Sequence, residues 1–306
     1  MSRLDVIIRM HDPARLDELN RAVFSAALQD MPSVTIHVVC QRFTAPDLKA
    51  VRRCLAPIMA LAPGTTLQVH NRVDPLPCDA RAALLNLGIA AAHRTPGGRY
   101  LAFLDYDDLI YPEGWRLLAA ELEATGAAIA FGAVLNATVS RHGLVPLVTA
   151  KQHIFHGDGL RQLLHSNFCP LHSFLIDCTR LPPGLVFDET LTALEDYDFL
   201  LRVVSHCPSS FRLKDKPIGE YLLKDDGSNM NPMARSSHPA SSTPSTWAAA
   251  IAAVDARKRH MVLSQAVQTQ LGIDRPGLTV AGLLTGVSDP RPQATASGGA
   301  GLSSTG

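Results

Sequence analysis

The first third of the chain alternates two kinds of hydrophobic pattern. Short apolar runs fall at 4–9, 34–40, 67–70 and 99–104. Segments with apolar residues at helical spacing lie between them, at 12–30, 47–61 and 79–93. Runs of the first kind predict buried strands, and the longer periodic segments predict helices. Because strands that alternate with helices form βαβ units, this pattern predicts a largely parallel sheet with helices packed against it.

The second half of the chain has a less regular pattern. It predicts a strand pair at 127–135 and 137–149, a strand at 172–178, a helix at 195–205, extended chain at 211–224 and one amphipathic helix at 247–271. Together the two halves predict an α/β fold of Rossmann type. Its sheet is expected to be mixed but mostly parallel, with helices on its faces.

Changes in composition divide the chain into four parts. Residues 1–229 carry the α/β pattern and are predicted to form one domain. Residues 230–246 are rich in Ser and Pro and are predicted to be a linker. Residues 247–288 are predicted to be a helical C-terminal extension, and residues 289–306, which have few large apolar side chains, a disordered tail.

Composition and charge exclude several classes of protein. Hydrophobic residues make up 46% of the 306 residues, enough for a sizeable core. The net charge is zero, so no basic field favours nucleic acid as a partner. The six cysteines include no C-x-x-C pair, which argues against a zinc site and favours reduced thiols. We therefore expect a cytoplasmic protein, with peripheral contact to the inner face of the membrane left open.

The strongest chemical signal is a group of acids at the end of a predicted buried strand. Asp105, Asp107 and Asp108 follow the apolar run 100–104. Side chains at the carboxyl ends of strands face the ligand crevice of an open α/β sheet. Carboxylates crowded there favour a hard cation, Mg²⁺ or Mn²⁺, which usually binds together with substrate phosphates. A solvated acidic turn is the alternative interpretation. An aspartyl-phosphate phosphatase is disfavoured because Leu109-Ile110 follow, not a threonine.

A second acidic group opens the predicted helix at 195–205. Glu195 and Asp196 are followed by Tyr197 and Asp198. Carboxylates at a helix N-terminus are favoured by the helix dipole, so these acids have a purely structural explanation. Asp196 also has the chemistry of a general base if it lies near a metal site. The residues alone leave both interpretations open.

Two basic positions are weaker candidates. Arg81 and Asn86 share the predicted helix just before the acidic strand, where one or both could lie near a phosphate or a sugar. An ordinary surface helix explains them equally well. Lys224 begins the polar segment 224–229, for which a turn is the simpler interpretation. Functionally, its ammonium group could neutralise a diphosphate leaving group.

Taken in order, these blocks resemble the family 2 glycosyltransferases of GT-A fold. The matching text is LDVIIR, then RAALLNLGIAAAHRTPGGRYLAFLDYDDLIYPEGW, then HSFLIDCTRLPPGLVFDETLTALEDYDFLLRV. The family has an Arg–Asn–Gly helix, a strand that ends in D-x-D-D, and a later Glu–Asp pair that opens a helix. All three occur here in that order, across roughly residues 4–229.

The resemblance implies a metal-dependent, inverting hexosyltransferase. It would move a sugar from a nucleotide-diphospho-sugar to a hydroxyl of a saccharide or lipid-linked acceptor, as in the synthesis of cell-surface polysaccharide or glycan. By this resemblance, Asp105 would contact the ribose and Arg81 the nucleotide. Asp107 would bind the metal with support from Asp108, and Lys224 would contact the diphosphate. Glu195 would contact the acceptor, and Asp196 would be the base.

Departures from the family pattern keep two other functions in view. The family commonly has an acid after its second strand, where residues 39–43 here read VCQRF. That absence is compatible with a degenerate, non-catalytic module that binds nucleotide-sugars. A nucleotidyltransferase on a related sheet is the other alternative. It would normally carry a glycine-rich basic loop after the first strand, and residues 9–13 contain no glycine.

Overall fold

A computed structural model describes residues 2–75, 78–142, 145–153, 159–224 and 244–285. The strands are β1 (Arg3–Met10), β2 (Val34–Gln41), β3 (Thr65–Arg72), β4 (Gly98–Asp105), β5 (Leu109–Ile110), β6 (Ile129–His142), β7 (Val145–His153), β8 (Phe174–Asp177) and β9 (Ser209–Lys224). The helices are α1 (Leu16–Ala27), α2 (Ala45–Leu61), α3 (Arg81–Arg94), α4 (Gly114–Thr125), α5 (Leu160–His165), α6 (Glu195–His206), α7 (Pro244–Lys258), α8 (Gln265–Leu271) and α9 (Val280–Leu284).

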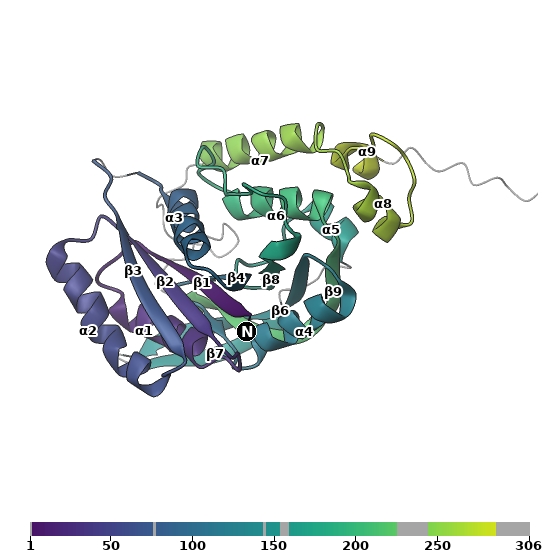
Figure 1. The fold of residues 1–306 in the computed structure, drawn as a ribbon. Helices are drawn as coiled ribbons and strands as arrows, with labels where there is room; N and C mark the ends of the chain where they lie inside the picture. The colour runs from purple at the N-terminus through teal and green to yellow at the C-terminus, as the bar shows by residue number, and fades with distance from the viewer. Residues whose placement is uncertain (1, 76–77, 143–144, 154–158, 225–243, 286–306) are drawn as a thin grey trace, which may run out of the picture.

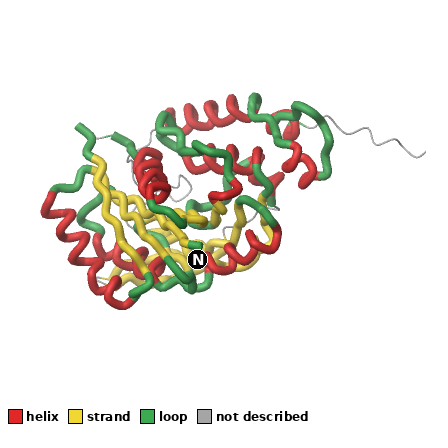
Figure 2. The backbone as a smooth tube through the Cα atoms, in the orientation of Figure 1, coloured by secondary structure: helices red, strands yellow, loops and turns green. Residues whose placement is uncertain are grey.

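All of these strands belong to one sheet, which helices cover on both faces (Figures 1 and 2). The strand order is β3-β2-β1-β4-β8-β6-β9-β5, and β7 pairs with β6 outside this path. The pairs among β1, β2, β3 and β4 are parallel, whereas β8 runs antiparallel between β4 and β6. The predicted mixed, mostly parallel α/β sheet flanked by helices is confirmed.

Side chains of each central strand alternate between two cores. On β1, Val6 and Ile8 face the core formed with α1, α2 and α4, while Ile7 faces the core beneath α3 and α6. Phe103 of β4 lies in the second core, where its ring contacts Phe199 of α6 edge-on at a centroid distance of 6.0 Å. This alternation places the last residue of β4 on the side of the sheet that α3 and α6 cover.

Close packing of α3 on β1 depends on a glycine. A Cβ added to Gly88 would lie 2.5 Å from Cγ2 of Ile7, well inside van der Waals contact. The absence of a side chain therefore lets the helix approach the strand closely. The close approach sets the distance between α3 and the sheet, and therefore the position of the start of α3 relative to the carboxyl end of β1.

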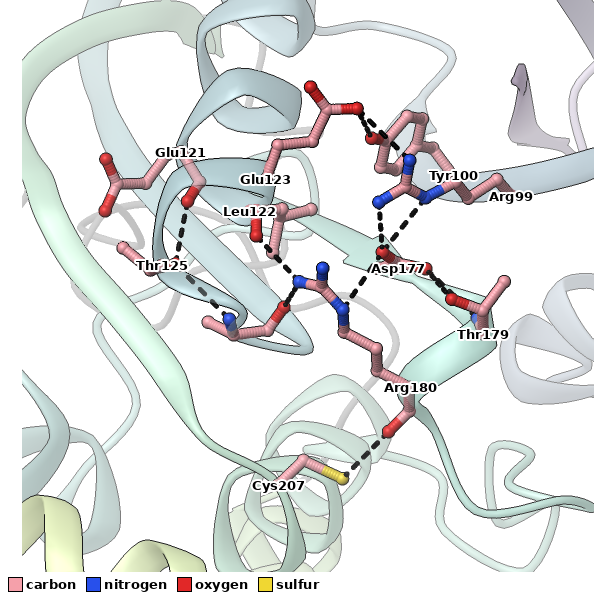
Figure 3. A network of polar contacts seen from close by, with 11 residues as sticks. Arg99, Tyr100, Glu121, Leu122, Glu123, Thr125, Asp177, Thr179, Arg180 and Cys207 are labelled. Atoms are coloured by element: carbon pink, nitrogen blue, oxygen red, sulfur yellow. Dashed lines mark hydrogen bonds and ion pairs between the residues drawn. The ribbon is translucent and has the colours of Figure 1, made fainter. Parts of the chain in front are cut away.

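The amino-terminal end of β4 is held by a separate polar network (Figure 3). Asp177, at the end of β8, accepts hydrogen bonds from Arg99 at 3.0 Å and from the hydroxyl of Thr179 at 2.6 Å. These contacts hold the pKa of Asp177 below its ordinary value even though burial alone would raise it. Arg180 donates to the carbonyl oxygens of Leu122 and Ala127, both at 2.7 Å. The network fixes β8 beside β4 and α4 at the end of the strand opposite the acids.

In the described part of the C-terminal segment, residues 244–285, the structure has three helices, and two of them share the stretch 247–271. The single helix predicted at 247–271 is wrong, because α7 ends at Lys258 and α8 begins at Gln265. Between them, Val262 forms a β-bridge with Thr279, and the backbone N–H of Ser264 donates to the carbonyl of Ser205 on α6. Tertiary contacts thus override a continuous helical pattern.

Some predicted parts lie wholly or partly outside the described residues. The tail at 289–306 does so entirely, and the linker at 230–246 does so up to residue 243. Within the part of the chain that is described, no helix has both the length and the apolar character needed to cross a bilayer.

Candidate functional site

A cavity of about 770 Å³ opens at the carboxyl ends of β1 and β4. Its walls come from these strand ends, the starts of α3, α6 and α7, and the facing parts of β6 and β9. Six of the seven predicted site residues line it: Arg81, Asp105, Asp107, Asp108, Glu195 and Asp196. The seventh, Lys224, reaches the cavity through its contact with Asp107. The fold therefore brings the two acidic groups together across a sequence separation of about ninety residues.

Asp105 forms an ion pair with an arginine on the neighbouring strand. Arg9 and Asp105 are register partners in the parallel pair of β1 and β4. The guanidinium nitrogen Nε of Arg9 donates to Oδ1 of Asp105 at 2.6 Å, and Nη2 donates to Oδ2 at 3.2 Å. Burial would raise the pKa of Asp105, but the charge and hydrogen bonds of Arg9 lower it below its usual value. Asp105 is therefore held as a carboxylate in a fixed orientation.

Asp107 forms an ion pair with the lysine at the end of β9. Nζ of Lys224 lies 2.7 Å from Oδ2 of Asp107 and 3.0 Å from Oε2 of Glu18, a buried residue of α1. Burial, the largest influence, raises the pKa of Asp107 despite the opposing pull of Lys224. The ammonium group thus lies between two carboxylates at the edge of the cavity.

Asp108 connects the acidic segment to β9. Its Oδ1 accepts a hydrogen bond from the backbone N–H of Leu222 at 2.9 Å, and its Oδ2 lies 3.4 Å from Nδ1 of His172. Burial and the charges of Asp107 and Asp105 raise the pKa of Asp108 well above its ordinary value. Burial lowers the pKa of His172 to about 4, so its imidazole is neutral near pH 7. Asp108 therefore holds β9 against the end of β4.

The start of α6 places two acids on the opposite side of the cavity. Leu194, immediately before the helix, has a φ of 58°, a left-handed conformation that costs a residue with a β-carbon about 1 kcal/mol or more. Oε1 of Glu195 accepts from Nη1 of Arg9 at 2.9 Å and lies 3.8 Å from Nε of Arg81. Arg9 thus links the sheet, through Asp105, to the first turn of α6.

Asp196 differs from its neighbours because it has no cation partner among the described residues within ion-pair distance. Its Oδ1 accepts a hydrogen bond from the backbone N–H of Tyr197 at 2.7 Å. Burial, with a smaller contribution from the charge of Glu195, raises the pKa of Asp196 to about 6. A carboxylate with such a pKa is ionised near pH 7 and yet basic enough to accept a proton.

The two candidates on α3 have separate positions. Arg81 lies at the first turn of the helix, where its Nη2 bonds Oδ2 of Asp79 at 2.8 Å and where it also contacts the carbonyl of Thr192. Asn86 does not line the cavity. It exchanges two hydrogen bonds with the backbone of Phe187, at 2.8 and 2.9 Å, and so fixes the loop before α6. The structure therefore brings Arg81 to the site and gives Asn86 a structural contact outside it.

Sequence reasoning missed three residues at or beside the cavity. From the sequence, Arg9 was considered only within the segment 9–13 that contains no glycine, and Glu18 and Trp247 were not considered as site residues. Arg9 ends an apolar strand whose partner strand ends in Asp105, which is a recognisable signal once the two strands are paired. For Glu18 and Trp247, no local signal distinguishes them from ordinary helical residues, since only tertiary packing brings α1 and α7 to this place.

Among the described residues, no three His, Cys, Asp or Glu side chains form a ready-made metal site. Asp108 uses one oxygen on a backbone N–H, whereas Asp107 lines the cavity with its Oδ2 on Lys224. Mg²⁺ typically binds to one or two carboxylates and completes its shell with phosphate oxygens and water. The residues therefore fit a metal that Asp107 shares with a bound diphosphate.

Solved structures with the same arrangement of elements include those of S. aureus TarS. TarS 1-349 in complex with UDP matches with a TM-score of 0.58 and 17% sequence identity, over 89% of this chain and 69% of that chain. TarS 1-349 in complex with UDP-GlcNAc matches with a TM-score of 0.52 and 15% identity, over 89% and 70%. A further TarS structure, of which this chain covers 42%, matches with a TM-score of 0.54. No protein-family model and no curated protein matches the sequence. At such identity the likeness is one of fold, and the chain has the GT-A-like fold that its sequence predicted.

Proposed function

We propose that this protein is an inverting glycosyltransferase that uses a nucleotide-diphospho-sugar as donor. The proposal rests on one contrast inside the cavity. Asp105 and Asp107 form ion pairs with cations, whereas Asp196 has no cation partner among the described residues within ion-pair distance, and its pKa is raised. The TarS structures add support, because they share the fold and were obtained with UDP and with UDP-GlcNAc.

The donor is proposed to bind along the ends of β1 and β4. Asp105, held ionised by Arg9, is oriented to accept a hydrogen bond from a ribose hydroxyl. Arg81 lies at the same wall and supplies positive charge to the nucleotide. Lys224 offsets the charge that develops on the diphosphate as it departs, as an ammonium group does in other phosphate sites.

Mg²⁺ or Mn²⁺ is proposed as the cofactor, with Asp107 as its protein ligand. When bound, the metal would act as a Lewis acid toward the diphosphate oxygens. Asp108 supports this arrangement indirectly, because its hydrogen bond to Leu222 fixes β9 and therefore Lys224 beside Asp107.

Transfer is proposed to start at Asp196. Its carboxylate accepts the proton of an acceptor hydroxyl as that oxygen attacks the anomeric carbon of the donor. The new C–O bond forms on the face opposite the diphosphate, the old bond breaks, and its electron pair leaves with the diphosphate. Configuration at the anomeric carbon therefore inverts. Glu195, oriented by Arg9, is proposed to contact the acceptor beside Asp196.

A donor screen tests this function. Purified protein is incubated with UDP-, GDP- and dTDP-sugars and a mixture of saccharide acceptors, with Mn²⁺, Mg²⁺ or EDTA, and released nucleoside diphosphate is measured. We expect release from at least one donor and its loss in EDTA. The Asp196→Asn variant should be inactive, whereas Asp215→Asn, the same change at a side chain that is 84% exposed, should be fully active.

Two additions to the screen, a nucleoside triphosphate with a sugar phosphate and calorimetry with nucleotide-sugars, separate the two alternative functions. A nucleotidyltransferase would release pyrophosphate from a nucleoside triphosphate and a sugar phosphate, and would release no nucleoside diphosphate. A degenerate module would bind a nucleotide-sugar in calorimetry without turnover under any metal condition. Either result would contradict the proposal.

A further inference from the structure

The first turn of α7 contributes an aromatic side chain to the cavity. The chain has two tryptophans, and they lie in very different places. Trp115 is fully buried in the core on the α4 side of the sheet. Trp247 is half-buried and lines the cavity together with Asp196. A segment outside the region of sequence resemblance thus forms part of the site.

Helix α7 is anchored at its far end on the first turn of α6 and its surroundings. Nη1 of Arg257 lies 2.7 Å from Oδ1 of the buried Asp198, and Arg257 also pairs with Asp188. Nζ of Lys258 donates to the carbonyl of His165 at 2.9 Å and lies 4.9 Å from the ring centroid of Tyr197. These contacts lie next to the acids that open α6, as Figure 1 shows for the two helices.

The helical repeat then places Trp247 over the cavity. Ala250 and Val254 of α7 are buried, and Trp247 precedes them by three and seven residues, so all three lie on the face that packs against the body. Trp247 and Arg257 are ten residues apart, which is about 15 Å along a helix. The indole therefore lies along α7 at a distance from the ion pair between Arg257 and Asp198. Two ion pairs of Arg257 and the buried face of the helix hold α7 in place.

The cavity that Trp247 lines also contains apolar side chains and neutral polar groups. Phe168, Leu171 and Leu194 line the same cavity and add apolar surface. Asn136 and Tyr221, register partners on β6 and β9, line it as well and offer an amide and a phenol. Apolar and aromatic lining residues that accompany convergent polar groups are typical of small-molecule sites.

We propose that Trp247 is the stacking surface for a pyranose ring of the acceptor, which makes the acceptor a saccharide and α7 a part of the active site. A pyranose has a face of C–H bonds and a rim of hydroxyls. Its C–H face suits the indole, and its rim suits the amide and phenol groups. This inference rests on the proposed function, because Asp196 must receive the proton of the hydroxyl presented by that ring.

Intrinsic fluorescence tests the contact without requiring turnover. In the Trp115→Phe variant, Trp247 is the only indole and reports on its own surroundings. The variant is titrated, with and without saturating UDP, with methyl glycosides and disaccharides of glucose, galactose, mannose and N-acetylglucosamine, and with decanol as a probe for a lipid. We expect a saturable change of emission with at least one saccharide. A response to decanol alone, or no response, would overturn the proposal.

Kinetics of two substitutions test the role of the ring. Trp247→Ala should raise the acceptor KM by about tenfold or more while leaving the donor KM unchanged. The reason is that the binding free energy from the aromatic contact and from the burial of apolar surface together exceeds the free energy that corresponds to a tenfold change in affinity. Trp247→Phe should recover part of the loss. An increase confined to the donor KM, or unchanged acceptor KM in Trp247→Ala, would overturn the assignment. Thermal melts of both variants check that the fold is retained.

Calorimetry with UDP and UDP-sugars keeps this result separate from the proposed function. If the wild-type protein binds none of these nucleotides and releases no diphosphate, the glycosyltransferase proposal fails. If it binds and turns over a donor while Trp247 responds to no saccharide, only the acceptor assignment fails.

Discussion

The aspartates of the cavity differ in their electrostatic surroundings. Asp105 and Asp107, at the end of β4, each contact a cation, at 2.6 Å to Arg9 and at 2.7 Å to Lys224. Asp196, at the start of α6, contacts the backbone N–H of Tyr197 and has a pKa near 6. Asp105, Asp107 and Asp196 have the same carboxylate side chain. What separates them is whether the neighbouring strand or helix supplies a cation.

This difference indicates a division of labour. A carboxylate paired with a cation is a poor proton acceptor but a well-oriented hydrogen-bond or metal partner. A buried carboxylate without a cation is more basic and is the better candidate for proton transfer. The following predictions test this contrast, in order of decreasing expected effect.

Removing the unmatched acid should abolish the chemistry. In Asp196→Asn, the amide cannot accept a proton, and we expect kcat to fall by about 10³-fold, within the usual range for loss of a general base. The donor Kd, measured by calorimetry, should change little because Asp196 is not among the contacts that we propose for the donor. A variant that binds donor normally and retains most of its kcat would refute the contrast.

Removing the cation that two acids share should affect stability. Arg9→Met leaves Asp105 and Glu195 without their common partner in a site where the Arg9 side chain is 14% exposed. We expect the free energy of unfolding to fall by about 3–5 kcal/mol, as for other broken buried ion pairs. Urea unfolding measures this change.

The matched control is Arg116→Met, which breaks a pair with Asp30 between side chains that are 45% and 73% exposed. Its expected cost is about 0–1 kcal/mol. Equal costs for the two variants would show that Arg9 is not an essential counter-charge.

The cation at the edge of the cavity should influence donor affinity more than stability. In Lys224→Met, the ammonium that contacts Asp107 is lost, and with it the counter-charge that we propose for the diphosphate. We expect the Kd for a nucleoside diphosphate to rise by about tenfold, the lower end of what a hydrogen bond to a charged group contributes. Calorimetry at fixed Mn²⁺ measures it. An unchanged Kd would remove Lys224 from the donor site.

The smallest effect concerns pH. The raised pKa of Asp196 means that its ionised form, which we propose accepts the proton, is lost as pH falls, so kcat/KM should decline below about pH 6. Glu195→Gln removes a neighbouring negative charge that raises this pKa. The midpoint of the acid limb should therefore move to lower pH, by up to about one pH unit, or 1.4 kcal/mol. A shift to higher pH would contradict the electrostatic assignment.

Much of the fold was accessible from the pattern of apolar residues. The strands at the start of the chain and the helix at Glu195 were predicted within a few residues, because burial on both faces of a parallel sheet leaves a clear apolar run. The acids after β4 were found because they interrupt such a run. These features are local, and their physical cause lies in a few consecutive residues.

Other features depend on contacts between distant segments. The pairing of Asp105 with Arg9 requires the parallel register of β1 and β4. The break between α7 and α8 requires Ser264 to reach Ser205 of α6. Neither has a signature in the surrounding sequence, and the position of Trp247 in the cavity follows from the docking of α7 alone.

The bridging role of Arg9 has a consequence for how the molecule is assembled. Arg9 and Glu195 are separated by 186 positions, and Glu18 and Lys224 by 206. Contacts of such long range form late, since the loop between them must be closed first. During synthesis, a nascent chain that ends before α6 already contains β1 to β4, yet Arg9 still lacks one of its acids. We therefore expect the ability to hold a ligand to appear abruptly, once α6 and the end of β9 have been synthesised, rather than to grow strand by strand.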